Sequence, residues 1–81
     1  MYTVYALYSE KFDKIYIGFT SDIVERFKSH NELSKKGWTL RFRPWKIIYS
    51  EEHLLKPDAM KREKQLKSST GRNFIRSLII N

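Results

Sequence analysis

Residues Ile15 to His30, with the sequence IYIGFTSDIVERFKSH, decide the fold that we predict for this chain. The first five residues alternate as a β-strand does, so Tyr16 and Gly18 share one face. Because glycine has no side chain, Gly18 marks a position where another group can approach the strand closely. The next residues are polar, and Asp22 is suited to cap the start of a helix.

The helix predicted after this strand brings two polar side chains to one edge. Arg26 and His30 are four residues apart and therefore lie along the same side of the helix. With Tyr16, they place a phenol, a guanidinium and an imidazole near one strand-to-helix corner. Each residue type is also common in purely structural positions, so the hypothesis of a functional site depends on the combination.

A first strand at residues 2–8 precedes this stretch, and a short polar segment connects the two strands. The simplest interpretation is a β-hairpin. If its loop is centred on Glu10 and Lys11, Tyr5 lies directly across from Tyr16, with Cβ atoms about 5 Å apart. A slip of one residue would place the two tyrosines on opposite faces, so the register is a testable prediction.

The remainder of the chain predicts one more strand and two more helices. The strand covers residues 45–52, which are rich in β-forming side chains. Pro57 suits the first turn of a helix that runs to Lys67, and a last helix covers residues 72–80. The residues of this last helix expected to pack inward are Phe74, Ile75, Leu78 and Ile79. The expected fold is α/β (α+β), a small three-stranded, mainly antiparallel sheet flanked by helices in the order ββαβαα, with residues 1–81 as one domain.

The composition favours a polyanionic partner. The 81 residues include 16 Lys and Arg against nine Asp and Glu, which gives a formal net charge of +7, and the pI is about 9.8. Such a balance is typical of nucleic-acid-binding proteins. The absence of cysteine excludes a disulfide framework and a thiolate metal site. Neither a signal-peptide pattern nor an apolar run near the roughly 18 residues of a membrane span is evident. We therefore expect a cytoplasmic protein, nucleoid-associated if bacterial, with no membrane partner.

Residues 31–44 are expected to form a loop in which basic and aromatic residues are interleaved. This mixture suits nucleic acid, because cations bind phosphates and aromatic rings stack on bases. The cations that we expect to contact phosphate are Lys35, Lys36, Arg41 and Arg43. Trp38 and Phe42 have two interpretations, which are stacking on bases and closure of the hydrophobic core.

Glu63 lies among the apolar positions of the helix that begins near Pro57. Ala59, Met60 and Leu66 define the inward face of that helix, and Glu63 falls in its middle. A buried carboxylate is costly unless it is paired or bound to a metal. The alternative is a peripheral Glu63 that pairs with Lys67, four residues further on.

Over nearly its whole length, the chain resembles a small stand-alone GIY-YIG nuclease domain. Tyr16-Ile17-Gly18 matches the second signature motif, and Thr3-Val4-Tyr5 corresponds to the first, in which only the tyrosine matches literally. The further matches are Arg26 and His30 on the first helix, Glu63 on a later helix, and Asn73, which is the weakest. Phe19 is a departure, because some members have a lysine directly after the second motif.

The resemblance implies a metal-dependent DNA endonuclease that hydrolyses phosphodiester bonds. One divalent metal, Mg²⁺ or Mn²⁺, would be held by Glu63, waters and the substrate phosphate. Arg26 would brace the phosphate, since its planar fork matches phosphate oxygens. The attacking water would be oriented or deprotonated by Tyr5 or Tyr16, and His30 is a competing base. All three candidates for the general base remain open.

Three classes of function are compatible with these observations. The first is a structure-selective or weakly sequence-selective nuclease of the DNA repair or recombination type, since no separate DNA-reading motif is present and a single module buries only about 600–1,000 Å² on DNA. A protein partner or a homodimer could then supply substrate selection. The second is a catalytically silent, basic nucleic-acid-binding module that retains the fold. The third is a structural protein–protein module, which leaves the charge unexplained. His53, beyond the third strand, is interpreted as a surface residue.

Overall fold

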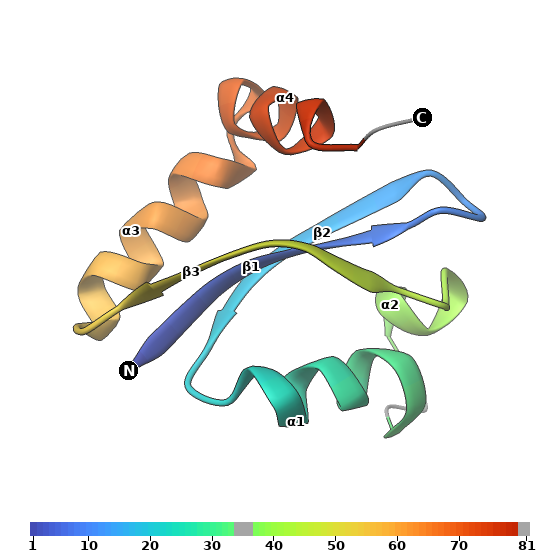
Figure 1. Ribbon diagram of the computed structural model, residues 1–81, viewed down its shortest axis with the longest axis horizontal. Helices are drawn as coiled ribbons and strands as arrows, with labels where there is room; N and C mark the ends of the chain where they lie inside the picture. Colours follow the sequence, from blue (N-terminus) through green and yellow to red (C-terminus); the bar gives the residue numbers. More distant parts are fainter. Residues whose placement is uncertain (34–36, 80–81) are drawn as a thin grey trace.

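The computed structural model describes residues 1–33 and 37–79 and has a three-stranded sheet between two layers of helices (Figure 1). The strands are β1 (Tyr2–Ser9), β2 (Lys14–Thr20) and β3 (Lys46–His53), all antiparallel and ordered β2-β1-β3. The helices are α1 (Ile23–Lys28), the π-helical segment η1 (Ser29–Leu33), α2 (Trp38–Arg41), α3 (Lys56–Lys67) and α4 (Ser69–Ser77). The predicted α+β fold is confirmed, with α2 as an extra short helix where a loop was expected. Within the described residues, no helix is both long and apolar enough to cross a membrane.

Each face of the sheet is covered by different helices. On one face, α3 and α4 close the larger core, whose buried residues are Val4, Ala6, Tyr8, Ile15, Ile17, Ala59, Leu66 and Ile75. On the other face, Tyr5, Leu7 and Trp45 form a second core, against which Ile23 and Phe27 of α1 pack. Successive residues of β1 therefore alternate between the two cores, as side chains do along a β-strand.

The hairpin register differs by two residues from the predicted one. Tyr5 pairs with Gly18, and Leu7 pairs with Tyr16, because the loop is centred one residue further along the chain. Asp13 closes this loop with a positive φ of 52°, a conformation that Asp tolerates better than most residues. A shift of two residues preserves the face of every side chain. Tyr5 and Tyr16 therefore remain diagonal neighbours, with ring centroids 6.3 Å apart.

The start of α1 is capped as predicted. Asp22 has an extended backbone, and its Oδ1 accepts a hydrogen bond from the backbone N–H of Glu25 at 3.1 Å. This contact satisfies one of the amide groups that a helix N-terminus leaves unpaired. The cap fixes where α1 begins, and therefore which of its side chains face the sheet.

The inward face of α3 lies to one side of the predicted one. Ala59 and Leu66 are buried, but Met60 is about half exposed, so the prediction that Met60 packs inward is wrong. The buried stripe passes through Arg62, which lies three residues after Ala59 and four before Leu66. Glu63 consequently lies at the edge of the inward face and is partly buried.

Only Ser68 separates α3 from α4, so the last helix begins three residues earlier than predicted. This corner requires glycine, because a Cβ on Gly71 would overlap the backbone of Gln65 and Leu66. Phe74 is exposed instead of packing inward as expected. Its ring meets the ring of Tyr49 edge-on, with centroids 5.6 Å apart. Ile75, Leu78 and Ile79 pack on the core as predicted.

Candidate active site

Tyr5 lies at the centre of the candidate site. It is fully buried on the central strand β1, and its hydroxyl oxygen lies 2.9 Å from Nε2 of His30. The phenol lies directly over its strand partner Gly18, where a Cβ would be only 2.8 Å from the hydroxyl oxygen and 3.0 Å from Cζ. Only glycine leaves room for this arrangement. The close approach expected at Gly18 is therefore made by Tyr5.

Tyr16 lies beside Tyr5 on the same face and is only partly buried. Its ring centroid is 4.7 Å from that of His30 and 6.3 Å from that of Tyr5. Trp38 stacks on it at 6.4 Å with an interplanar angle of 29°, and Trp45 meets it edge-on at 6.4 Å. Tyr16 is thus held in position by rings while part of it remains open to solvent.

His30 is buried at the junction between α1 and η1. Its backbone is fixed by Arg43, whose Nε donates to the carbonyl oxygen of His30 at 2.6 Å and whose Nη2 donates to that of Ser29 at 3.1 Å. Arg43 was expected to contact phosphate, but these contacts commit much of its guanidinium to positioning His30.

A second connection holds the same region and was not anticipated from the sequence. The side chain of Asn31 accepts from the backbone N–H of Trp45 at 2.7 Å and donates to its carbonyl oxygen at 3.0 Å. The indole N–H of Trp45 donates to the carbonyl oxygen of Thr39 at 2.8 Å. Asn31 therefore connects η1 to the residue before β3, and Trp45 in turn is bonded to α2 through Thr39. A single asparagine in a polar stretch gives no pattern that would have identified this role.

The protonation states of the buried pair follow from burial and nearby charges. Burial raises the pKa of Tyr5 well above its usual value, the charges of Tyr16 and Glu63 act in the same direction, and Arg26 partly opposes them. Burial also lowers the pKa of His30, and the nearby charges of Arg26 and Arg43 lower it further. At neutral pH, Tyr5 is therefore a phenol and His30 a neutral imidazole. The phenol can donate its proton to Nε2 of His30.

The charges of Arg26 and Glu63 also act on this cluster. Arg26 is exposed on α1, and its charge acts on both Tyr5 and His30. The charge of Glu63 on α3 contributes to the raised pKa of Tyr5. Oε1 of Glu63 lies 3.4 Å from Nζ of Lys67. The structure thus shows the alternative interpretation of Glu63, at the edge of the inward face and paired with Lys67, while its charge still acts on Tyr5.

The candidate DNA-binding residues are more dispersed. Arg41 is exposed on α2, with its guanidinium carbon 5.5 Å from the ring centroid of Phe42. Asn73 is exposed on α4, across the sheet from His30. Lys35 and Lys36 lie outside the described residues. Of the predicted set, the structure brings together Tyr5, Tyr16, Gly18 and His30, with Arg26 and Glu63 within electrostatic reach.

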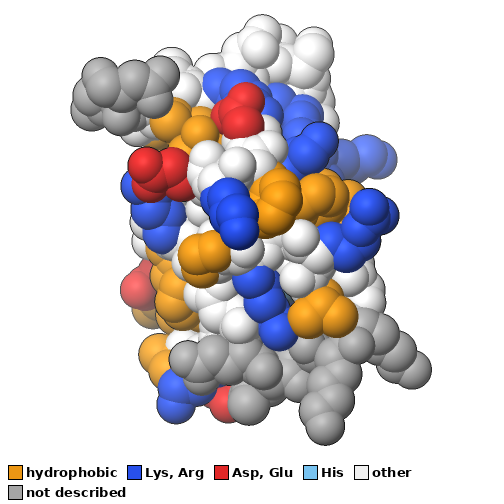
Figure 2. Space-filling model, turned by 90° about the vertical axis from the view of Figure 1, so that its right-hand side faces the viewer, with side chains coloured by type: hydrophobic (Ala, Val, Ile, Leu, Met, Phe, Trp, Pro, Cys, Tyr) orange, Lys and Arg blue, Asp and Glu red, His pale blue; other side chains and the backbone are white. Residues whose placement is uncertain are grey.

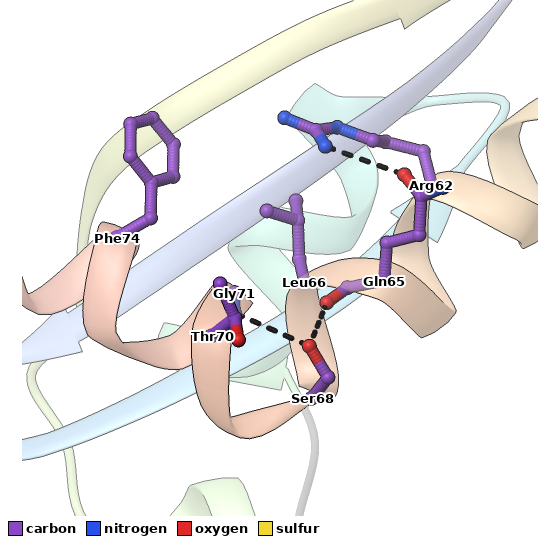
Figure 3. A pocket seen from close by; sticks show the side chains of 7 residues that line it. All are labelled: Arg62, Gln65, Leu66, Ser68, Thr70, Gly71 and Phe74. Carbon is purple, nitrogen blue, oxygen red and sulfur yellow. Dashed lines mark hydrogen bonds between the residues drawn. The ribbon is translucent and has the colours of Figure 1, made fainter.

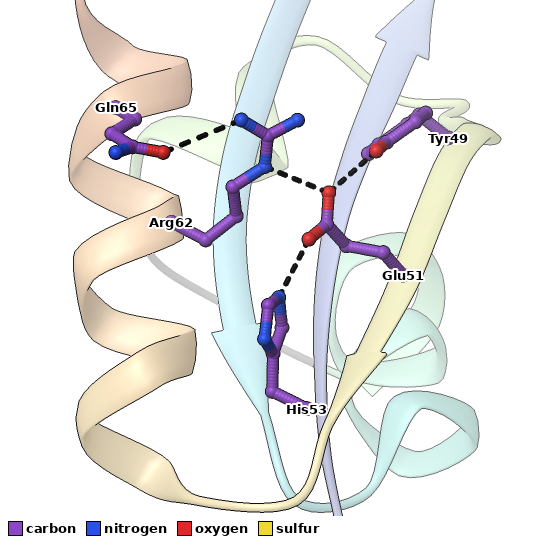
Figure 4. Close-up of polar contacts among 5 residues, drawn as sticks. All are labelled: Tyr49, Glu51, His53, Arg62 and Gln65. Carbon is purple, nitrogen blue, oxygen red and sulfur yellow. Dashed lines mark hydrogen bonds and ion pairs between the residues drawn. The ribbon is translucent and has the colours of Figure 1, made fainter.

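A separate polar network lies on the opposite face of the sheet (Figure 4). Oε1 of Glu51 accepts from the hydroxyl of Tyr49 at 2.5 Å and from Nε of Arg62 at 2.9 Å. Oε2 of Glu51 lies 2.6 Å from Nε2 of His53. His53 was interpreted as a surface residue, but it is partly buried and tied to Glu51. This network joins β3 to α3 and has a structural role.

A hollow of about 310 Å³ lies at the corner between α3 and α4 (Figure 3). Its lining consists of Arg62, Gln65, Leu66, Ser68, Thr70, Gly71 and Phe74. The hydroxyl of Ser68 donates to the carbonyl oxygen of Gln65 at 2.6 Å and accepts from the N–H of Gly71 at 3.2 Å. These contacts stabilise the turn, and Arg62 is paired with Glu51. The hollow is separate from the Tyr5–His30 site, because α3 and α4 cover one face of the sheet and Tyr5 lies on the other.

This combination of a hairpin, a following helix and a tyrosine–histidine pair over a glycine agrees with the comparison to known families. Residues 1–76 match the GIY-YIG catalytic domain. The match covers more than half of the chain, and the chain therefore belongs to the GIY-YIG family, a family of nuclease domains.

Individual relatives match most of the chain. A UPF0213 protein of Limosilactobacillus reuteri is 36% identical over 73 residues, which cover 88% of this chain and 75% of the relative. A UPF0213 protein of Staphylococcus aureus is 31% identical over 62 residues, which cover 76% of each chain. No solved structure matches.

Proposed function

We propose that this protein is an endonuclease that hydrolyses a phosphodiester bond of DNA. The observation that carries the proposal is the buried hydrogen bond between Tyr5 and His30 at 2.9 Å, beside the partly exposed ring of Tyr16. The opposite charges of Arg26 and Glu63 both act on this group. Phosphoryl transfer needs an oriented water and stabilisation of the charge on the phosphate oxygens, and these side chains are of the types that provide both.

Arg26 is the residue suited to bind the scissile phosphate. Its side chain is exposed at the edge of the site, so an incoming phosphate can reach it. A guanidinium presents two parallel N–H groups that match two phosphate oxygens. Its positive charge would stabilise the negative charge that increases on those oxygens during the reaction.

We assign the contact with the attacking water to Tyr16 and the support of Tyr16 to the Tyr5–His30 pair. Tyr16 is the more exposed phenol, whereas the hydroxyl of Tyr5 is already bonded to His30. The raised pKa of Tyr5 keeps its proton on the phenol at neutral pH, which makes Tyr5 a poor base. His30 is neutral under the same conditions because its pKa is lowered. Its ring, packed against Tyr16, keeps that phenol in place.

Glu63 is the residue that would hold a divalent metal. The donors among the described residues fit only a sparse site, because no group of three or more His, Asp or Glu side chains lies close enough together there to enclose a metal. Mg²⁺ is commonly bound in this way, by one or two carboxylates, waters and substrate phosphate. The ion pair with Lys67 does not prevent this, since Lys67 is half exposed and such pairs contribute little. When bound, the metal would stabilise the charge on the leaving oxygen.

The proposed substrate and setting follow from the charge and the size of the chain. The net charge of +7 favours a polyanion, and the nuclease family makes DNA the first choice. We propose a structure-selective or weakly sequence-selective activity in DNA repair or recombination, in the cytoplasm or at the nucleoid. A protein partner or a second copy could add selectivity.

Cleavage of end-labelled single-stranded, duplex, flap and branched DNA in the presence of Mg²⁺ or Mn²⁺ tests the proposal. Glu63→Gln keeps the shape of the side chain and removes its charge, so we expect it to abolish cleavage but to leave binding in metal-free buffer largely intact. Glu52→Gln is the matched control, because Glu52 is exposed on β3, and it should cut like the wild type. Equal cleavage by Glu63→Gln would contradict the metal-ligand assignment.

The same assay separates the two tyrosines. If Tyr16 contacts the water, Tyr16→Phe lowers the cleavage rate by about 100-fold or more, the range for loss of a general acid–base group. Tyr5→Phe should lower it less. Absence of cleavage by the wild type on every substrate, together with salt-sensitive DNA binding, would instead support a binding module that retains the fold.

A further inference from the structure

Three aromatic side chains contact one another beside the candidate site; Phe12 and Trp38 are exposed, and Phe42 is partly buried against the second core. Phe12 at the tip of the β1–β2 hairpin is 40% exposed, and Trp38 on α2 is 45% exposed. Phe42, after α2, lies between them, with ring centroids 5.5 Å from Phe12 and 4.8 Å from Trp38. We refer to Phe12, Trp38 and Phe42 as the aromatic surface.

The aromatic surface begins at Tyr16. Trp38 stacks on the Tyr16 ring with centroids 6.4 Å apart and planes at 29°. A nucleotide whose base contacts Trp38 would therefore have its phosphate close to Tyr16. The aromatic surface is therefore directly adjacent to the candidate site, through the contact between Trp38 and Tyr16.

Closure of the core does not explain the exposure of Trp38. The second core on this face is already closed by Trp45, which is buried and whose indole N–H is bonded to Thr39. A single exposed apolar side chain is common, but contiguous exposed apolar side chains framed by polar residues mark binding sites. Trp38 and Phe12 together therefore indicate a ligand that presents flat, apolar faces.

Cations are positioned around these rings. Nζ of Lys14 and the guanidinium carbon of Arg41 lie 5.6 and 5.5 Å from the ring centroid of Phe42, and Nζ of Lys11 lies 5.5 Å from that of Phe12. Figure 2, which views the side where the hairpin tip and α2 lie in Figure 1, shows Lys and Arg side chains interspersed with hydrophobic ones. Cation–π contacts keep these charges close to the rings. A ligand that combines flat faces with regularly spaced negative charges fits this surface, and single-stranded nucleic acid has both properties.

We propose that the aromatic surface, with Lys11, Lys14 and Arg41, binds an unpaired segment of the DNA strand next to the phosphate that reaches Tyr16. Trp38 stacks on one base, Phe12 and Phe42 contact the neighbouring bases, and the cations bind the phosphates between them. Bases inside a duplex already stack on their neighbours and cannot offer a free face to Trp38. The substrate class is thus DNA with unpaired nucleotides at the cut. The placement of the cut rests on the proposed nuclease function, but the binding of unpaired bases does not.

Binding measured in metal-free buffer tests this inference without cleavage. The probes are a fluorescent oligothymidylate and a fluorescent duplex of the same length, followed by anisotropy. Trp38→Ala and Phe12→Ala should each weaken binding of the oligothymidylate by about tenfold, since base–aromatic stacking contributes about 1–3 kcal/mol per base. Binding of the duplex should change by less than about twofold, because it depends mainly on phosphate contacts.

Two further variants make the result specific. Trp38→Phe keeps an aromatic face and should restore most of the affinity for oligothymidylate. Phe74→Ala is the matched control, because Phe74 is 42% exposed on α4, across the sheet, and both probes should bind it as they bind the wild type. If Trp38→Ala does not fold, as judged by circular dichroism, Phe12→Ala decides the question.

The outcomes distinguish this inference from the proposed nuclease. An unchanged affinity for oligothymidylate in Trp38→Ala and Phe12→Ala, or an equal loss for both probes, would overturn the aromatic surface even if Glu63-dependent cleavage is observed. A selective loss for oligothymidylate without any DNA cleavage by the wild type would support the aromatic surface and reject the nuclease.

Discussion

The hydroxyl oxygen of Tyr5 lies 2.9 Å from Nε2 of His30, and both side chains are buried. This contact joins the central strand of the sheet to the segment after α1, over 25 residues of sequence. Burial raises the pKa of Tyr5 and lowers that of His30, so at neutral pH both groups are uncharged, and their hydrogen bond satisfies two polar atoms that water cannot reach. The pair therefore links the stability of the fold to the geometry around Tyr16.

Tyr5→Phe tests the structural part of this link. The substitution keeps the ring but removes the hydroxyl, so Nε2 of His30 loses its buried partner. We expect the free energy of unfolding to fall by about 1–3 kcal/mol, the cost of leaving a buried polar group unsatisfied. Urea denaturation measures this change. Tyr2→Phe, on the same strand but against the other core, is the control and should have little effect; an equal loss there would argue against a special role for Tyr5.

Gly18→Ala should disturb the site more than the fold. The new Cβ would lie 2.8 Å from the hydroxyl oxygen of Tyr5 and 3.2 Å from Cε1 of Tyr16. Both rings must therefore move, so the hydrogen bond to His30 is lost or lengthened and Tyr16 is displaced from the position assigned to it. We expect a loss of stability of about 1–3 kcal/mol, typical of overpacking, and loss of nearly all cleavage in the folded fraction.

Gly71→Ala is an informative contrast to Gly18→Ala. Its Cβ would overlap the backbone of Gln65 and Leu66 at the corner between α3 and α4, which cannot move aside as a side chain can. Thermal unfolding should therefore show a larger destabilisation for Gly71→Ala, while cleavage per folded molecule remains close to that of the wild type. The reverse pattern would contradict the assignment of Gly18 to the site.

The acid sensitivity of the protein should depend on His30. Its pKa in the folded state is lowered by burial and then by Arg26 and Arg43, so below about pH 6.5 the unfolded state binds a proton that the folded state does not. Stability should therefore fall as the pH is lowered from about 7 to about 5. His30→Gln should have a flatter melting temperature over this range. A wild type with the same pH dependence as His30→Gln would contradict the buried, neutral state of His30.

The prediction that Tyr5 and Tyr16 share a face depended on where the hairpin loop was centred, and the predicted pairing was wrong by two residues. Alternation with period two is unchanged by a slip of two residues, so the two tyrosines still share a face, whereas a slip of one residue would have separated them. The register depends on the hairpin loop, where Asp13 adopts a positive φ and is held by Arg76 from the far end of the chain at 2.8 Å. No local pattern reports that contact.

The segment that follows α1 was the least predictable, because its structure depends on distant partners. Asn31 is bonded to the backbone of Trp45, and Arg43 is bonded to the carbonyl groups of Ser29 and His30. These contacts hold His30 beside Tyr5 and connect the segments on either side of α2. The residues that make them follow no periodic pattern in the sequence. Phe74 was a second error. It was expected to pack inward with Ile75, Leu78 and Ile79, but it is 42% exposed and its ring meets that of Tyr49.

Glu51 and Glu63 are both partly buried but should have opposite roles. Glu51 accepts hydrogen bonds from Tyr49 and Arg62 and contacts His53 (Figure 4), so Glu51→Gln removes the charge of this network and turns an amide towards a donor. We expect the free energy of unfolding to fall by about 1–3 kcal/mol, with cleavage per folded molecule unchanged. Glu63→Gln should instead lose cleavage with little change in stability, because its ion-pair partner Lys67 is half exposed.

The pH dependence distinguishes the two positions further. Burial alone would raise the pKa of Glu51, but the hydrogen bonds from Tyr49, Arg62 and His53 outweigh it and lower the pKa. The stability contributed by Glu51 is therefore present above its unfolded pKa of about 4.3 and is lost as the pH falls through the lower folded pKa. Urea denaturation at neutral pH and at about pH 3 should show that this acid-labile part is absent from Glu51→Gln and retained in Glu63→Gln. Loss of cleavage in a folded Glu51→Gln protein would show that the network also supports the site across the sheet.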